Sequence, residues 1–454
     1  MLIRAGRRIS VLCPPRRNFR DSWSGNELAP LFYRDGISDH ITRLNLRSNG
    51  ADRRVLKMKR GLMFGLVAVF AISLSWSAKS WAAGEVTVGV AVSMTGRYAE
   101  PAGRFVNSWK LFVDQRNAAG GWLGKKIKLT ILDDKSDKQQ SIKLFEKLIT
   151  QDKVDLTMGP YSSGITDAVA NIFERYKYPT MAPGAASGII WKRGRKYLFN
   201  IVAVAQDYQK GALHIARDIG IKRIAVVGED SLFPRQTAEG VRAWAKKLGL
   251  KIVLEESYPR KQQDFTALLQ KIKSRGAEAL ISNSYFADST AQIRGLRELN
   301  INLKMFAGTV GPALPKFAKQ LGATAEYVLG FSQWEPKPDI LKRPGMRKYI
   351  AAYQKRYGVK PNYHAGQSYA VFQVLEAAIN KGGSTERDKV WKTLRTMSTT
   401  SIIGPWKVDK NNLNNHEGLT FQILDGQRKI VWPPKLAEVK YKLPMPAWKK
   451  RSKN

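Results

Sequence analysis

The 454-residue chain is poor in residues that build covalent or metal-bound sites: it has one cysteine, Cys13, and four histidines. A single thiol excludes an intramolecular disulfide and a thiolate metal site, and the histidines lack the spacing of metal ligands. We therefore expect no metal and no cofactor. Catalytic motifs are also missing, because no Gly-rich loop ends in Gly-Lys-Ser/Thr and no His-Glu-x-x-His occurs. Residues 160–164 lack the first glycine of a nucleophile elbow, so we expect no enzyme.

Acidic residues are scarce: 37 Asp and Glu stand against 76 Lys and Arg, which gives a net charge of +39. Such a field favours anionic partners, namely nucleic acid, an acidic membrane or an anionic solute, although a solvated surface that maintains solubility explains it equally simply. Basic residues are dispersed and are not interleaved with aromatic ones, so nucleic-acid binding is not expected. With 43% hydrophobic residues, the chain can build a sizeable core in two or three domains.

No apolar run matches the roughly 20 residues that a membrane-spanning helix needs. Residues 61–76 form a shorter run that follows two basic residues and precedes a small-residue cleavage site after Ala82, which is typical of a signal peptide. An uncleaved anchor is the alternative. We expect residues 58–83 to be the signal peptide and the mature periplasmic protein to begin near Ala83 or Gly84. Residues 1–57 are expected to be a mis-assigned, disordered extension.

From Gly84 onward, short β-branched runs alternate with longer amphipathic stretches, which is typical of βα units and a parallel sheet. Two such series, 84–200 and 222–332, predict two Rossmann-like α/β lobes with parallel sheets joined by a hinge. The expected strands are 86–92, 127–132, 154–158, 224–227, 252–254, 279–282 and 305–307, and the expected helices are 104–118, 139–151, 166–176, 208–219, 237–248, 265–274 and 289–299.

The chain is expected to cross between the lobes at residues 200–207 and later to return, because the helices after Arg343 need a sheet to cover. Three late strands, at 406–408, 419–424 and 429–432, are predicted as a terminal β segment. The expected division is 84–205 plus 333–400 for lobe 1, 206–332 plus 401–440 for lobe 2, and a flexible basic tail over 441–454.

Ligands of open parallel sheets bind beyond the carboxyl ends of the strands, so the loops after the strands form the candidate site. Their Gly, Ser and Thr residues allow close backbone approach and hydrogen bonding, and their aromatic residues supply apolar walls. Ser163 and Ser187 are expected to open helices, whose N–H groups favour a carboxylate. Any single loop is better explained as a cap or turn, but six together favour a site. The predicted ligand-binding residues are Tyr98, Tyr161, Ser162, Ser163, Gly184, Ala185, Ala186, Ser187, Phe233, Tyr285, Phe286 and Thr309.

These loops resemble those of the branched-chain amino acid (leucine/isoleucine/valine) binding proteins of ABC importers, which have the type I periplasmic binding fold. The resemblance covers nearly all of residues 84–435. It implies a periplasmic solute-binding protein that closes its lobes by hinge motion, has a membrane permease as partner and is a monomer. The matching segments are Val-Ser-Met-Thr-Gly (92–96), Asn-Ala-Ala-Gly-Gly (117–121), Leu-Asp-Asp-Lys-Ser-Asp (132–137), Gly-Pro-Tyr-Ser-Ser-Gly (159–164), Ala-Pro-Gly-Ala (182–185) and Gln-Asp-Phe-Thr-Ala-Leu (263–268).

The resemblance implies that Ser163 and backbone N–H groups hold a ligand carboxylate. The acidic residue that binds the α-ammonium in amino acid binders aligns with Thr309 and its neighbour, where no acid stands. Asp288 and Glu229 are the alternatives. Because a buried ammonium without a carboxylate is costly, we expect a carboxylate or amide solute that lacks an α-ammonium and is walled by aromatic residues.

A ligand-sensing periplasmic receptor domain of the same fold is the alternative function. A receptor would need a membrane span after the fold, and the sequence after Trp432 contains no apolar run. A transcriptional regulator would need a helix-turn-helix before Gly84, where the signal peptide is expected. The solute-binding component of an importer is therefore the preferred hypothesis.

Overall fold

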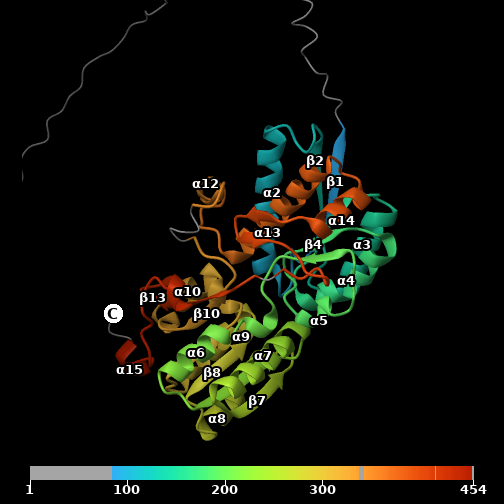
Figure 1. Cartoon of the computed structure of the whole chain (residues 1–454). Coiled ribbons are helices and arrows are strands. Elements are labelled where there is room, and N and C mark those ends of the chain that lie inside the picture. Colours follow the sequence, from blue (N-terminus) through green and yellow to red (C-terminus); the bar gives the residue numbers. More distant parts are fainter. Residues whose placement is uncertain (1–83, 337–341, 415, 452–454) are drawn as a thin grey trace, which may run out of the picture. The chain divides into compact units, whose positions relative to one another are not determined.

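The computed structural model describes residues 84–336, 342–414 and 416–451. Within them the chain forms two α/β lobes, each a sheet flanked by helices (Figure 1). The predicted α/β class with two lobes is thereby confirmed. The predicted N-terminal extension and signal peptide lie outside the described residues, as do residues 452–454 of the predicted tail.

Lobe 1 is built on a five-stranded parallel sheet with the order β2-β1-β3-β4-β5. In β1, Val90 and Val92 belong to one core cluster and Ala91 to another, because successive side chains point to opposite faces of the sheet. The strands are β1 (Glu85–Val92), β2 (Lys126–Asp133), β3 (Leu156–Met158), β4 (Thr180–Ala182) and β5 (Leu198–Asn200), and the helices are α2 (Ala99–Ala118), α3 (Lys138–Thr150), α4 (Ser163–Tyr176), α5 (Gly188–Trp191), α12 (Met346–Tyr357), α13 (Tyr363–Gly382) and α14 (Arg387–Thr396).

Lobe 2 is built on a seven-stranded sheet with the order β14-β13-β10-β9-β8-β6-β7. The strands are β6 (Arg223–Glu229), β7 (Lys251–Tyr258), β8 (Ala279–Asn283), β9 (Met305–Gly308), β10 (Leu329–Ser332), β13 (Leu419–Leu424) and β14 (Gln427–Trp432), and the helices are α6 (Lys210–Asp218), α7 (Leu232–Leu248), α8 (Thr266–Ser274), α9 (Phe286–Glu298) and α10 (Pro315–Leu321).

One edge of the lobe 2 sheet differs from the expected parallel arrangement. Strand β13 runs antiparallel to both β10 and β14. Strands β13 and β14 are joined by Asp425 and Gly426, whose φ values are 53° and 68°. A two-residue turn with positive φ at both positions connects antiparallel strands, because a parallel pair needs a crossover of a dozen or more residues.

Three segments of chain cross between the lobes, and Gln333 of the middle segment contacts the other two. The Ala203 N–H donates to Gln333 Oε1 (2.9 Å), and Gln333 Nε2 donates to the Tyr208 hydroxyl (2.7 Å). The ring of His416, in the last segment, donates from Nε2 to the Gln333 carbonyl (2.7 Å). These hydrogen bonds hold the three crossings together as one hinge.

The last crossing lies later in the chain than the expected division at residue 401. The hairpin of β11 (Thr399–Ser401) and β12 (Gly404–Trp406) lies against lobe 1, where Trp406 Nε1 donates to the Asn200 carbonyl (2.8 Å). Asn412 Nδ2 likewise donates to the Lys196 carbonyl (2.9 Å). The chain therefore joins lobe 2 only at β13.

The tail that was expected to be flexible packs against lobe 2 over residues 441–451. Its backbone exchanges two hydrogen bonds with the Gln422 side chain, and Trp448 is buried. The Trp448 indole donates to the Ile301 carbonyl (2.8 Å), and the Arg451 guanidinium lies 3.8 Å from the Trp448 ring centroid. Burial of the indole outweighs the Lys- and Pro-rich composition that suggested fraying.

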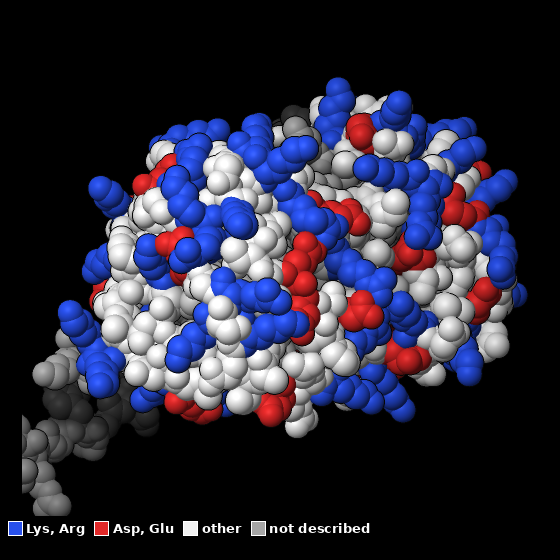
Figure 2. All heavy atoms as spheres, turned by 90° about the horizontal axis from the view of Figure 1, so that it is seen from below, with Lys and Arg blue, Asp and Glu red and all other residues white. Residues whose placement is uncertain are grey.

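Basic residues are distributed rather than gathered on the face of the molecule seen from below. Figure 2 shows Lys and Arg interleaved with Asp and Glu over this face. Among the described residues, no helix is both long and apolar enough to cross a membrane. Nor do the residues of this part of the chain include a group of three or more His, Cys, Asp or Glu placed to hold a metal ion.

We predict that Trp448→Ala destabilises lobe 2 by about 3 kcal/mol, because replacing a buried tryptophan by alanine removes apolar contacts and leaves a cavity. The measurement is the unfolding midpoint in urea. The control is Lys450→Ala, at an exposed position of the same short helix, α15 (Trp448–Arg451). Equal midpoints for the two variants would show that the tail does not support the fold.

Candidate functional site

The carboxyl ends of the strands of the two lobes face each other across a cleft. The loop after β1 contributes Tyr98, whose ring centroid lies 5.0 Å from that of Tyr285, which follows β8 in lobe 2. Tyr98 also packs against Tyr161, which follows β3, at 5.6 Å, and Tyr285 packs against Phe233 of α7 at 5.9 Å. Four aromatic residues singled out from the sequence thus meet at the junction of the lobes.

A small cavity of about 20 Å³ lies at this junction, which is room for about one water molecule. None of its lining residues is acidic or carries a Lys or Arg side chain. Seven predicted ligand-binding residues line it: Tyr161, Ser162, Ser163, Gly184, Ala186, Phe233 and Tyr285. The other lining residues are Pro183, Val202, Tyr208, Val310, Tyr363, His364 and Gln367.

The loops after β3 and β4 lie side by side and form the lobe 1 wall. Tyr161 and Gly184 make an isolated parallel β-bridge. A Cβ atom at Gly184 would lie 3.2 Å from the Pro160 carbonyl oxygen and from the Tyr161 Cα, so only glycine fits without displacement. Ser162 adopts φ 82° and ψ 142°, a region that is strained for a residue with a side chain. Strained residues of this kind concentrate at functional sites.

Ser163 joins the two loops through its hydroxyl. Its Oγ accepts the backbone N–H groups of Ala186 and Ser187, both at 3.1 Å. The N-cap of α4 is Ser162, one residue earlier, whose side chain accepts from the Ile165 N–H (3.3 Å). These two N–H groups of the loop after β4, a loop expected to hold a ligand carboxylate, are therefore paired with the hydroxyl oxygen of Ser163.

A chain of hydrogen bonds orients the Tyr161 hydroxyl. Asn362 Oδ1 accepts the Ala365 N–H (3.2 Å), so Asn362 Nδ2 is the donor that faces His364 Nδ1 at 3.3 Å. Burial lowers the pKa of His364 well below its usual value of 6.5, so the ring is neutral. A neutral ring that accepts at Nδ1 carries its proton on Nε2, which donates to the Tyr161 hydroxyl at 3.3 Å. The Tyr161 proton is then available to a solute in the cavity.

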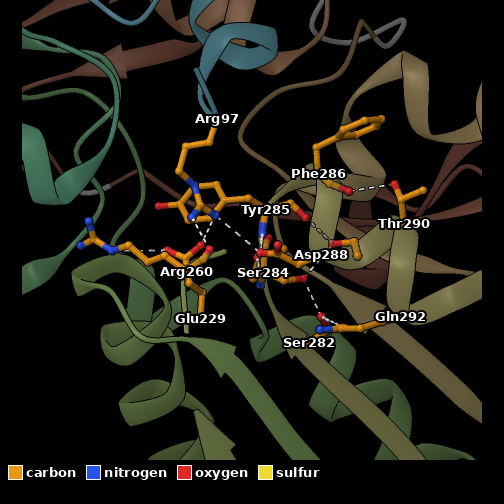
Figure 3. A network of polar contacts seen from close by, with 12 residues as sticks. Arg97, Glu229, Arg260, Ser282, Ser284, Tyr285, Phe286, Asp288, Thr290 and Gln292 are labelled. Carbon is orange, nitrogen blue, oxygen red and sulfur yellow. Dashed lines mark hydrogen bonds and ion pairs between the residues drawn. The ribbon is translucent and has the colours of Figure 1, made fainter. Parts of the chain in front are cut away.

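The structure places five predicted ligand-binding residues outside the lining of this cavity. Ala185 and Ser187 lie in the loop after β4 and are fully buried. The Thr309 hydroxyl accepts the Ser284 N–H and donates to the Ser284 carbonyl. Phe286 points away from Arg97 and Glu229 (Figure 3). Tyr98 lines a second cavity of about 10 Å³ beside the first. These residues were predicted to bind the ligand because they follow the ends of strands. Which of them reach the cavity depends on the direction of each side chain.

An acidic pair lies beside the cavity in lobe 2 and is neutralised from lobe 1. Arg97, in the loop between β1 and α2, forms an ion pair with Glu229 and lies 3.7 Å from Asp288 Oδ2 (Figure 3). Burial raises the pKa of Asp288, and the nearby Arg97 opposes that rise. The two acids named as alternatives for an ammonium partner thus already have a cation.

The lining residues that come from the hinge and from α13 were not predicted from the sequence. Tyr208 follows the first crossing, and Tyr363 and His364 open α13. Asn362 caps this helix directly after Pro361, and that cap was a visible start signal in the sequence. The helices after Arg343 were expected in lobe 1, but no signal in the sequence indicated that the first turn of α13 would reach the cleft.

The cavity is much smaller than an organic solute. An engineered cavity that binds benzene measures about 150 Å³. The rings of Tyr161, Phe233 and Tyr285 line this cavity and leave no room in it for a molecule of that size. Entry of a solute therefore requires the lobes to move apart at the hinge or these rings to rotate.

We predict that the protein loses stability as the pH falls from 7 to 5, in part through His364. The unfolded chain binds a proton at this histidine below about pH 6.5, whereas the folded chain does not, so folding becomes less favourable by up to about 1.4 kcal/mol per pH unit. His364→Gln should reduce the change in melting temperature over this range.

The control is His214→Gln, at a half-buried histidine outside the cleft whose pKa burial also lowers. We expect a smaller effect there, because burial lowers the pKa of His214 to a lesser degree. Identical pH profiles for the wild type and His364→Gln would contradict the prediction.

Comparisons with known proteins agree with this geometry. The profile of a family described as periplasmic binding protein matches residues 85–427. A Leu/Ile/Val-binding protein homolog of Brucella suis is 27% identical over 382 residues, covering 80% of this chain and 95% of its own.

Two solved structures show the same fold. A branched-chain amino acid transporter substrate-binding protein of Streptococcus pneumoniae, in complex with isoleucine, has a TM-score of 0.71 at 21% identity and covers 77% of this chain and 100% of its own. A solute-binding protein of an R. palustris ABC transporter, in complex with benzoate, has a TM-score of 0.68 at 18% identity and covers 80% of this chain and 97% of its own.

Proposed function

The chain belongs to the periplasmic binding protein family, and from this premise we propose that it is the extracytoplasmic solute-binding component of an ABC importer. It captures a small organic solute, a carboxylate or amide without an α-ammonium group, between its lobes. It then presents the solute to a membrane permease. It acts as a monomer after export by a cleaved signal peptide and carries no catalytic role.

The observation that carries this proposal is the junction of the two lobes. Loops that follow β3 and β4 of lobe 1 and segments that follow β6 and β8 of lobe 2 line one cavity. Ligands of parallel sheets bind at these strand ends. Because the lobes are joined by three hydrogen-bonded crossings, hinge motion can open and close the cavity around a solute.

The chemistry of the lining supports an acid or amide. The Tyr161 hydroxyl accepts from His364 and is left with its own proton to donate to a solute oxygen. Burial raises the pKa of Tyr161 well above its usual value of 10, so the hydroxyl remains a donor at all physiological pH values. The lining offers no carboxylate to pair with a solute ammonium.

The aromatic walls support a flat or branched apolar body. Tyr161, Phe233 and Tyr285 present rings to the cavity from both lobes. The relatives in the comparisons include a protein in complex with benzoate and another in complex with isoleucine. Since the acids near the cleft are already paired, the benzoate-like class fits this lining better than the amino acid class.

We predict that benzoate or 4-methylpentanoate raises the melting temperature of the purified protein and that leucine does not. Tyr161→Phe should weaken binding of the acids about tenfold, because a hydrogen bond to a charged group contributes about 1.5–3 kcal/mol. The measurement is a thermal-shift screen followed by isothermal titration calorimetry.

Tyr197→Phe serves as the matched control, because the Tyr197 ring stacks on Trp391 at 5.5 Å and does not line the cavity. This variant should bind as the wild type does. If α-amino acids alone raised the melting temperature, the proposed solute class would be wrong.

A further inference from the structure

Two carboxylates are buried in lobe 2 next to the solute cavity. Glu229 is the last residue of β6 and has a fully buried side chain, and Asp288 lies in the first turn of α9 with 7% of its side chain exposed. Asp288 accepts the Tyr285 N–H at 3.4 Å. Ionised groups at such positions are costly to bury unless a cation pairs with them. The closure of the cleft therefore requires a positive charge at this place.

The chain itself supplies that charge from the opposite lobe. Arg97 forms the ion pair with Glu229, lies within 3.7 Å of Asp288, and donates from Nη1 to the Arg260 carbonyl (3.3 Å). Arg260 of lobe 2 contributes a second cation, but its Nε is 4.0 Å from Glu229 Oε1 and its side chain is 43% exposed. Among the described residues, Arg97 is thus the closest cation to both acids.

Arg97 lies next to two aromatic rings at the junction of the lobes. Its guanidinium lies 5.3 Å from the Tyr98 ring centroid and 5.1 Å from the Tyr285 centroid, within the range of cation–π attraction. Tyr285 also lines the cavity. A charge on the solute at this wall would therefore be close to the guanidinium.

We propose that Arg97 is the specificity-determining residue of the cleft: it occupies the position beside Glu229 and Asp288 that a solute ammonium would need, and so excludes solutes that carry one. This inference rests on the proposed function and explains its solute class. An ammonium would have to displace the guanidinium or approach a like charge, which is unfavourable. A solute carboxylate is instead attracted by the same guanidinium.

Removal of the guanidinium should therefore change the selectivity. In Arg97→Met the side chain keeps most of its length, but the acidic pair is left available to a cation from the solute. The probes are 3-phenylpropionate and phenylalanine, which differ only in the α-ammonium group. We expect the ratio of their affinities, measured by calorimetry on the mature protein, to shift at least tenfold toward phenylalanine in the variant.

Two further variants separate this effect from a general loss of charge. Arg97→Met combined with Glu229→Gln should lose much of the gain for phenylalanine, because one of the two carboxylates is gone. Lys138→Met removes a positive charge that lines the smaller neighbouring cavity. Because this variant loses a positive charge without leaving Glu229 and Asp288 unpaired, it should shift the ratio toward phenylalanine much less than Arg97→Met does.

The outcomes distinguish this inference from the proposed function. If the wild type binds 3-phenylpropionate and Arg97→Met leaves the ratio unchanged, the role of Arg97 is refuted and the solute class stands. If the wild type prefers phenylalanine, both are refuted.

If neither probe binds, the inference can still be tested by a stability measurement that needs no solute. Melting temperatures of Arg97→Met, Glu229→Gln and the double variant form a double-mutant cycle. We expect Glu229→Gln to restore part of the stability that Arg97→Met removes, because it eliminates the unpaired buried carboxylate. Strictly additive effects would refute the pairing on which the inference depends.

Discussion

The carboxyl ends of the strands in the two sheets face each other, and this arrangement determines where the site of the protein lies. The lobe 1 edge ends in loops whose backbones turn sharply, and small residues such as Gly184 and the strained Ser162 occupy them. The edges of the two sheets bring together aromatic rings from both lobes. A solute site at this junction needs no additional element, because the sheets themselves position its walls.

Two opposing contributions determine the free energy of closing the cleft: the packing of apolar rings favours closure, and the burial of charged carboxylates opposes it. The packed rings of Tyr98, Tyr161 and Tyr285 exclude water and favour contact between the lobes. Glu229 and Asp288 oppose that contact unless a cation reaches them, and Arg97 reaches them from the other lobe. The hinge, tied together through Gln333, lets this balance change without disturbing either core.

Secondary structure was predictable in segments where the hydrophobic repeat extends over many residues. The first residue of each helix was harder to predict. Helices α2 and α7 begin at Ala99 and Leu232, about five residues before the expected starts. Pro101 and Pro234 lie in their first turns, where proline fits a helix but suggests a loop in the sequence. Strands β4 and β5, of three residues each and fully buried, showed no alternation that could identify them.

The sequence by itself determined the α/β class, the two lobes and the strand-end loops that bear Tyr161, Ser163 and Tyr285, because hydrophobic periodicity and turn residues are local properties. Only the tertiary structure decided that His364 of α13 orients Tyr161 and that Arg97 neutralises Glu229. These pairs join residues more than 100 positions apart, and their contact depends on how the two lobes and the returning helix pack. No local pattern in the chain encodes that packing.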